Sequence, residues 1–349
     1  MNNKSVFCGA RVCLALAVAV GGVVGGVVSL GAQTSPFVRA MTEPWPETLV
    51  VDGIEILPVR KNVYMLAGGG ANISIAIGDE GVVMVDSGAA GSAAKIQAAI
   101  RRLTRKPLRY LVNTAADPDK VGNNSEMVKW AGGTSGPQAA AGGQGGGQGG
   151  RPANVGTAFI AHEASYNRMI TGGNGLAALT GDALPDSTFF TPRKDFWAND
   201  EAVQLFYEPN AHTDGDLMVF FRGSEVVHAG EIYRTDQFPA LDVQRGGSIN
   251  GLLGGLNHLL EIAVPQRNQM GGTRIVPAYG RISNEADVLE YRDMLTIIRD
   301  RVQDLAGKGQ TLAQVRAAGV ALEYQHYGKN PRWTTDMFVE AVYTSLMKK

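Results

Sequence analysis

The stretch VNTAADPDKVGNN, residues 112–124, combines side chains that could do chemistry with a layout that could position them. An apolar run ends in a turn dense in small and acidic residues, and a glycine then opens a helix pattern. Such a layout delivers side chains to a metal at the end of a strand, but no histidine stands in it. Asp117 and Asp119 supply carboxylates, and Lys120 supplies a positive charge beside them. The stretch therefore predicts either an oxygen-rich metal site or a loop held together by ion pairs.

Strand and helix patterns on both sides of this stretch indicate what positions it. Short β-rich runs alternate with turns from about residue 48, and a helix pattern follows in which Ile96, Ile100 and Leu103 recur at spacings of four and three. A second set of strand-like runs begins at AVQLFYEP and again ends in helix patterns. Two rounds of strands, each followed by helices, predict an α/β fold with sheets packed face to face and helices outside.

The chain divides into a main domain and shorter flanking parts. We expect one domain over residues 48–305 and a C-terminal helical extension over residues 306–349. Residues 131–154 form an insertion that is rich in glycine and poor in apolar residues, and it is predicted to be disordered because it cannot bury enough surface to order itself.

Residues 1–31 have the pattern of a secretory signal peptide. Lys4 and Arg11 precede or flank a long apolar run, no acidic residue occurs, and Ser29 and Gly31 suit an export cleavage site. The alternative is an uncleaved membrane anchor, since the apolar run is almost long enough to span a bilayer. We expect the protein to be exported, to the periplasm or the medium.

Composition narrows the function classes further. Both cysteines, Cys8 and Cys13, lie in the signal segment, so a mature chain would have no disulfide, thiolate ligand or cysteine nucleophile. The formal charge is −1, and loss of Lys4 and Arg11 would change it to −3. Such a near-neutral chain is not expected to bind nucleic acid or, once the signal is removed, a membrane. Its oligomeric state stays open.

Five segments, in order along the chain, resemble motifs of the metallo-β-lactamase superfamily of MBL-fold metallo-hydrolases. They are GVVMVDSG, NTAADPDKVGNN, NAHTDGDLMVFF, VVHAGEIY and IVPAYGRIS. The resemblance runs nearly end to end. It implies a four-layer αββα sandwich of metal-dependent hydrolase ancestry, with its site where the strand ends of the two halves meet.

The metal ligands that the resemblance implies match less well than the frame. Only Asp119 and His212 keep the residue types of the family's motifs. Histidine positions of the family are taken by Ala115, Asp117, Lys120 and Tyr279, and Glu231 stands where a bridging aspartate would be. The dinuclear zinc site of the family therefore cannot be assembled, and the site is expected to be degenerate.

Two readings of this site follow. In the first, Lys120 beside Asp119 or Asp117 replaces the charge of an ion, and the protein is a non-catalytic or weakly active domain that binds a small molecule in the sandwich cleft. Ala115, Lys120, Tyr279 and Asp86 would line that site, Asp86 chiefly by fixing the turn after its strand.

In the second reading, one divalent ion of zinc, manganese or iron is bound by Asp117, Asp119, His212 and Glu231. The ion would polarise a carbonyl and lower the pKa of bound water toward ~7, with Asp119 as candidate base. The substrate would be a β-lactam, lactone, thioester or phosphoester. A third reading, a structural or assembly module, is not separated from the first by the sequence.

Overall fold

The computed structural model describes residues 48–134, 156–173, 175–267 and 271–348. The predicted signal segment, both cysteines and residues 135–154 of the glycine-rich insertion lie outside these residues. Among the described helices, none combines the length and apolar character needed to cross a membrane.

The first half of the chain forms an eight-stranded sheet whose strands lie in chain order. These strands are β1 (Leu49–Val51), β2 (Ile54–Arg60), β3 (Val63–Ala67), β4 (Ile73–Ile77), β5 (Val82–Val85), β6 (Leu108–Val112), β7 (Ala158–His162) and β8 (Ser187–Phe189). β1 to β5 pair antiparallel, and β5 to β8 pair parallel. β5 (VVMV) and β7 (AFIAH) read as nearly continuous apolar runs because both of their faces are covered.

Short helices connect the parallel strands of this sheet. They are α2 (Ala93–Leu103), α3 (Pro118–Val121), α4 (Asn124–Trp130), α6 (Glu163–Thr171) and the 3₁₀ helix η1 (Gly181–Ala183). α2 buries Ile96 and Ile100 against the sheet, as the sequence spacing predicts. Pro118 occupies the start of α3, where a missing N–H costs nothing.

The second half forms a five-stranded sheet in the order β13-β12-β11-β10-β9. The strands are β9 (Arg193–Ala198), β10 (Glu201–Glu208), β11 (Asp216–Phe221), β12 (Val226–Gly230) and β13 (Arg274–Pro277). The helices of this half are η2 (Val243–Arg245), α7 (Ile249–Ile262) and α8 (Glu285–Gly307). Ser248 caps α7, and Asn284 with Asp287 forms a capping box at α8.

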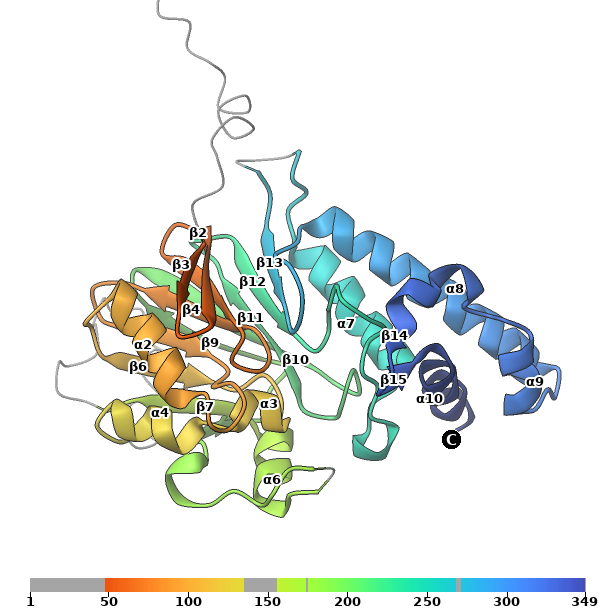
Figure 1. Ribbon diagram of the computed structural model, residues 1–349, viewed down its shortest axis with the longest axis horizontal. Coiled ribbons are helices and arrows are strands. Elements are labelled where there is room, and N and C mark those ends of the chain that lie inside the picture. The colour runs from red at the N-terminus through yellow and green to blue at the C-terminus, as the bar shows by residue number, and fades with distance from the viewer. Residues whose placement is uncertain (1–47, 135–155, 174, 268–270, 349) are drawn as a thin grey trace, which may run out of the picture.

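The two sheets pack face to face, with α2 and α4 outside the first and α7 and α8 outside the second (Figure 1). Side chains such as Val85, Val112, Leu205 and Val219 fill the space between the sheets. This arrangement is the predicted four-layer αββα sandwich.

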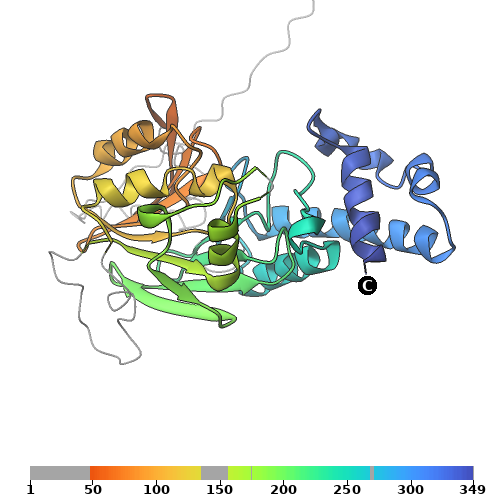
Figure 2. The same cartoon turned by 90° about the horizontal axis from the view of Figure 1, so that it is seen from below.

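Residues 312–347 add a small helical unit. It comprises α9 (Leu312–Ala317), η3 (Leu322–Gly328), the hairpin strands β14 (Lys329–Asn330) and β15 (Trp333–Thr334), and α10 (Thr335–Met347). Phe338 and Val342 of α10 belong to the same hydrophobic cluster as Leu256 of α7 and Ile298 of α8. Figures 1 and 2 place α8, α9 and α10 together at the end of the molecule remote from α2.

A bridge closes the described structure on either side of the glycine-rich insertion. Thr134 pairs with Thr157 in parallel fashion. The Thr157 N–H donates to the Gly133 carbonyl at 2.9 Å, and its hydroxyl donates to the Leu108 carbonyl at 3.0 Å. The segment that follows α4 and the segment that precedes β7 therefore lie next to each other.

Candidate functional site

Strand ends of both sheets deliver the predicted site residues to one corner of the molecule. Asp117, Asp119 and Lys120 follow β6 of the first sheet. His212 lies between β10 and β11, and Glu231 directly follows β12 of the second sheet. We call the following set the charged corner: Asp117, Asp119, Lys120, His212, Glu231, Arg234, Arg245 and Tyr279.

Asp117 is bound by two cationic side chains. Arg245 Nη2 lies 2.5 Å from Asp117 Oδ1, and His212 Nε2 lies 3.2 Å from Asp117 Oδ2. Arg245 Nε also donates to Asp242 Oδ2 at 2.8 Å. Burial by itself would raise the pKa of Asp117, but His212, Lys120 and Arg245 outweigh it and hold that pKa well below its usual range.

His212 is held through both ring nitrogens. Its Nδ1 lies 2.9 Å from the Ala240 carbonyl, which can only accept, so Nδ1 is a donor. Burial would lower the pKa of His212, but the charge of Asp117 and its hydrogen bond raise that pKa to about 10. With Nδ1 bonded to Ala240 and Nε2 to Asp117, His212 has no free nitrogen for a metal ion in this arrangement.

Lys120 is among the largest fully buried side chains and supplies a further cation. Its Nζ lies 2.6 Å from Glu231 Oε1 and 3.7 Å from Asp119 Oδ1. Burial would lower the pKa of Lys120, but Glu231 and Asp119 raise it well above its usual value. Burial would raise the pKa of Glu231, but the charges of Lys120 and Arg234 lower it to about 2.

Tyr279 completes the corner from the loop after β13. Its hydroxyl donates a hydrogen bond to Asp119 Oδ2. Its ring centre lies 4.5 Å from Arg234 Cζ and 5.9 Å from Lys120 Nζ, so the ring face adds to the binding of both cations. Burial and the charge of Asp119 raise the pKa of Tyr279, so the phenol stays neutral and is not a tyrosinate ligand.

The remaining predicted lining residues are buried in the frame of the corner. Ala115 is fully buried. Asp86, with a positive φ of 64°, accepts hydrogen bonds from the Thr114 N–H at 2.8 Å and the Thr114 hydroxyl at 2.7 Å. Asp86 therefore fixes the start of the acidic loop after β6, whereas the sequence predicts a role in the turn after its own strand, β5.

The donor set does not fit a divalent ion in this arrangement. Both oxygens of Asp117 and both nitrogens of His212 face protein groups, and the near oxygen of Glu231 faces an ammonium. Across the part of the chain that the structure describes, no group of three or more His, Cys, Asp or Glu side chains is arranged to hold a metal ion. The role of Asp119 as a base stays a prediction.

Two cations of the charged corner escaped the sequence analysis. Arg234 lies three residues after Glu231, and its Nη1 is 3.6 Å from Glu231 Oε2. Arg245 belongs to DVQRGG, which resembles no motif of the family. The position of Arg234, three residues after Glu231, could have predicted their ion pair from the sequence. Arg245 reaches Asp117 only because of how its loop folds.

The chain belongs to the metallo-beta-lactamase superfamily, whose sequence profile matches residues 66–264, more than half of the chain. Members of this superfamily commonly use divalent metals. No curated protein matches the sequence.

Solved structures share the fold at low sequence identity. A double mutant of the sec-alkyl sulfatase PisA1 is similar with a TM-score of 0.61 at 14% identity, over 84% of this chain and 50% of the sulfatase. A metallo-beta-lactamase from Pontibacter korlensis gives a TM-score of 0.51 at 15% identity, over 70% and 99%. The DIM-1 metallo-beta-lactamase gives 0.51 at 13% identity, over 70% and 98%. The chain thus spans about half the length of the sulfatase that it resembles.

Proposed function

We propose that this protein is a ligand-binding member of the superfamily that functions without a divalent metal ion. One observation carries the proposal: Lys120 and Arg245 hold Glu231 and Asp117 by ion pairs of 2.6 Å and 2.5 Å. These two cations supply the positive charge that a bound ion would otherwise supply.

Electrostatics favour the side-chain cations over an added ion. Two unit charges of like sign 4 Å apart repel by about 4 kcal/mol at an effective dielectric constant of 20, and a divalent ion doubles that figure. A divalent ion bound to the same carboxylates as Lys120 and Arg245 would be repelled by both of these side chains. Freeing the carboxylates would require two buried cations to lose their partners, which is also costly.

The cellular location and the class of ligand are inferred from the sequence alone. Residues 1–31 support export, and a near-neutral charge supports a small-molecule ligand over a nucleic acid. We therefore propose an exported ligand-binding domain of hydrolase ancestry.

Elemental analysis of the purified protein tests the metal-independent function. Cells would be grown in medium supplemented with zinc, manganese and iron, and the wild type compared with Asp119→Ala and His212→Ala. We expect less than about a tenth of an equivalent of any of these metals in all three proteins. About one equivalent in the wild type that is lost in both variants would overturn the proposal and establish the single-ion hydrolase instead.

A further inference from the structure

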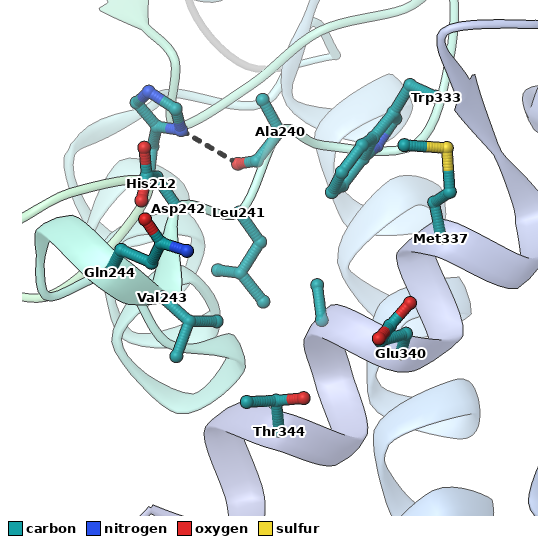
Figure 3. A pocket seen from close by; sticks show the side chains of 11 residues that line it. His212, Ala240, Leu241, Asp242, Val243, Gln244, Trp333, Met337, Glu340 and Thr344 are labelled. Carbon is teal, nitrogen blue, oxygen red and sulfur yellow. Dashed lines mark hydrogen bonds between the residues drawn. The ribbon is translucent and has the colours of Figure 1, made fainter. Parts of the chain in front are cut away.

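A groove adjoins the charged corner and is closed on one side by the C-terminal unit. It has a volume of about 550 Å³ and lies between the segment 240–244 and α10. Its lining includes Leu241, Asp242, Val243, Trp333, Met337 and Glu340. Figure 3 shows Leu241 and Val243 on the side of His212, with Trp333 and Met337 across the groove from them.

The walls of the groove are mostly apolar and partly fixed in place. The indole N–H of Trp333 donates to the Pro239 carbonyl at 3.1 Å, so the ring is oriented and its polar atom is satisfied. Met337 adds a polarisable side chain next to it. Pockets of this volume with apolar and aromatic walls are typical of small-molecule sites.

Acids outnumber bases among the charged side chains of the lining, which are His212, Asp242 and Glu340. Within the described part of the chain, no lysine or arginine lines the groove. His212 offers no free donor, because both of its nitrogens are bound.

Cations near the groove are engaged with groups of the protein. Arg245 binds Asp242 and Asp117. Arg316 pairs with Glu340 at 2.7 Å, and Lys348 Nζ donates to the Val243 carbonyl at 2.9 Å. The side chain of Glu340 is half exposed, and such a surface pair contributes little, so Glu340 can exchange its partner for a ligand.

The segment 240–245 connects the groove to the charged corner. The Ala240 carbonyl accepts from His212, and Asp242 accepts from Arg245. His212 and Arg245 are the two cationic partners of Asp117. A ligand that packs on the segment 240–245 therefore contacts the residues that position them.

We propose that the groove binds an apolar amine in its protonated form. The apolar body packs between Leu241 and Trp333, and the ammonium lies next to Glu340, within reach of the indole face. This inference rests on the proposed ligand-binding function and names its ligand class.

A matched series of indoles tests the ligand class. Tryptamine, 3-ethylindole and indole-3-acetate carry similar apolar bodies with a positive, neutral and negative charge. Ligand-observed NMR would measure their binding to the full protein, and a ligand of this size is expected to bind with a Kd on the order of 1 mM. We expect tryptamine to bind most tightly and indole-3-acetate least. Equal or tighter binding of indole-3-acetate, or no binding of the three, would overturn the proposal.

Two variants and a control locate the site. Ala341→Phe fills the groove and should weaken binding of tryptamine at least about tenfold. Glu340→Gln should weaken tryptamine about two- to fivefold and leave 3-ethylindole unchanged. Asp300→Asn is the matched control, since Asp300 is a comparably exposed acid paired with Arg299 outside the groove.

Unchanged tryptamine binding in Ala341→Phe would place the ligand elsewhere and overturn the inference. Metal analysis of the same samples is independent of these titrations. A protein that binds metal and also tryptamine contradicts the metal-independent function only, and a metal-free protein without tryptamine binding contradicts this inference only.

Discussion

Lys120 and Arg245 neutralise acids of the same corner from different environments. The Lys120 side chain is 0% exposed and its partner Glu231 is 4% exposed. Arg245 and Asp117 are each 11% exposed, and the second partner of Arg245, Asp242, is 19% exposed. The lysine pair is therefore almost completely removed from water, whereas the arginine pair is slightly exposed to it.

This difference indicates where the corner is least tolerant of change. A buried ion pair adds little net stability, but loss of one partner leaves a charge without water or counterion. Arg245 is bound by two acids, and Asp117 keeps His212 if the arginine is lost. We expect the cost of losing a cation to be larger at Lys120 than at Arg245.

Replacing Lys120 should have the largest effect. Lys120→Met leaves Glu231 buried with Arg234, 3.6 Å away, as its remaining ion-pair partner. We expect a loss of about 3–5 kcal/mol in the free energy of unfolding. Urea denaturation followed by circular dichroism measures it. The double variant Lys120→Met with Glu231→Gln removes both charges and should recover part of the loss. A cost below about 1 kcal/mol for the single variant would contradict this account.

Acid should weaken the same pair. Because Lys120 and Arg234 lower the pKa of Glu231 to about 2 in the folded protein, its stabilising contribution is present above its unfolded pKa near 4.5 and is lost as pH falls toward 2. We expect about 2 kcal/mol of this contribution to disappear between pH 5 and pH 3. Glu231→Gln should therefore lose less stability than the wild type over that range in urea titrations. Equal slopes in the two proteins would refute the assignment to Glu231.

Replacing Arg245 should have a smaller effect than replacing Lys120. Arg245→Met removes the hydrogen bonds to Asp117 and Asp242 but leaves the His212 pair, so we expect a loss of about 1–2 kcal/mol by urea denaturation. Asp242→Asn, which removes only the outer partner, serves as the milder control. If Arg245→Met cost as much as Lys120→Met, the contrast between the two sites would be wrong.

Adding metal should have the smallest effect. If the two cations already satisfy the acids, about 1 mM zinc or manganese should shift the melting temperature of the wild type by less than about 1 °C. Differential scanning fluorimetry with and without EDTA measures the shift. Stabilisation that grows with the logarithm of the metal concentration would instead indicate a specific site on the folded protein.

The fold and part of the corner follow from the sequence. Motif order predicts the αββα sandwich, and the acidic turn after β6 predicts a cation among the carboxylates. The lysine was expected beside Asp119 or Asp117, yet its closest partner is Glu231 of the other half of the chain. The long side chain of Lys120 extends from the first half of the chain to the second. The sequence alone does not predict which acid it contacts there.

Other features depend on tertiary structure. β8 and β9 were not expected, because the residues between α6 and β10 show no clear alternation and become strands through pairing with β7 and β10. The two-residue strands β14 and β15 are too short for a periodic signal. Arg245 lies far from Asp117 in the sequence, so only the folded loop identifies it as a partner.

The bridge between Thr134 and Thr157 has a practical consequence for the experiments above. Thr134 and Thr157 lie side by side at this bridge. The entropic cost of closing a loop grows only slowly with its length, so sequence inserted between the two threonines should cost little stability. An epitope or a labelled cysteine introduced there would give a reporter attached to the end of α4, on a different segment from the groove. Since the native cysteines Cys8 and Cys13 lie near the N-terminus, a protein without that segment would take a single fluorophore at the chosen place.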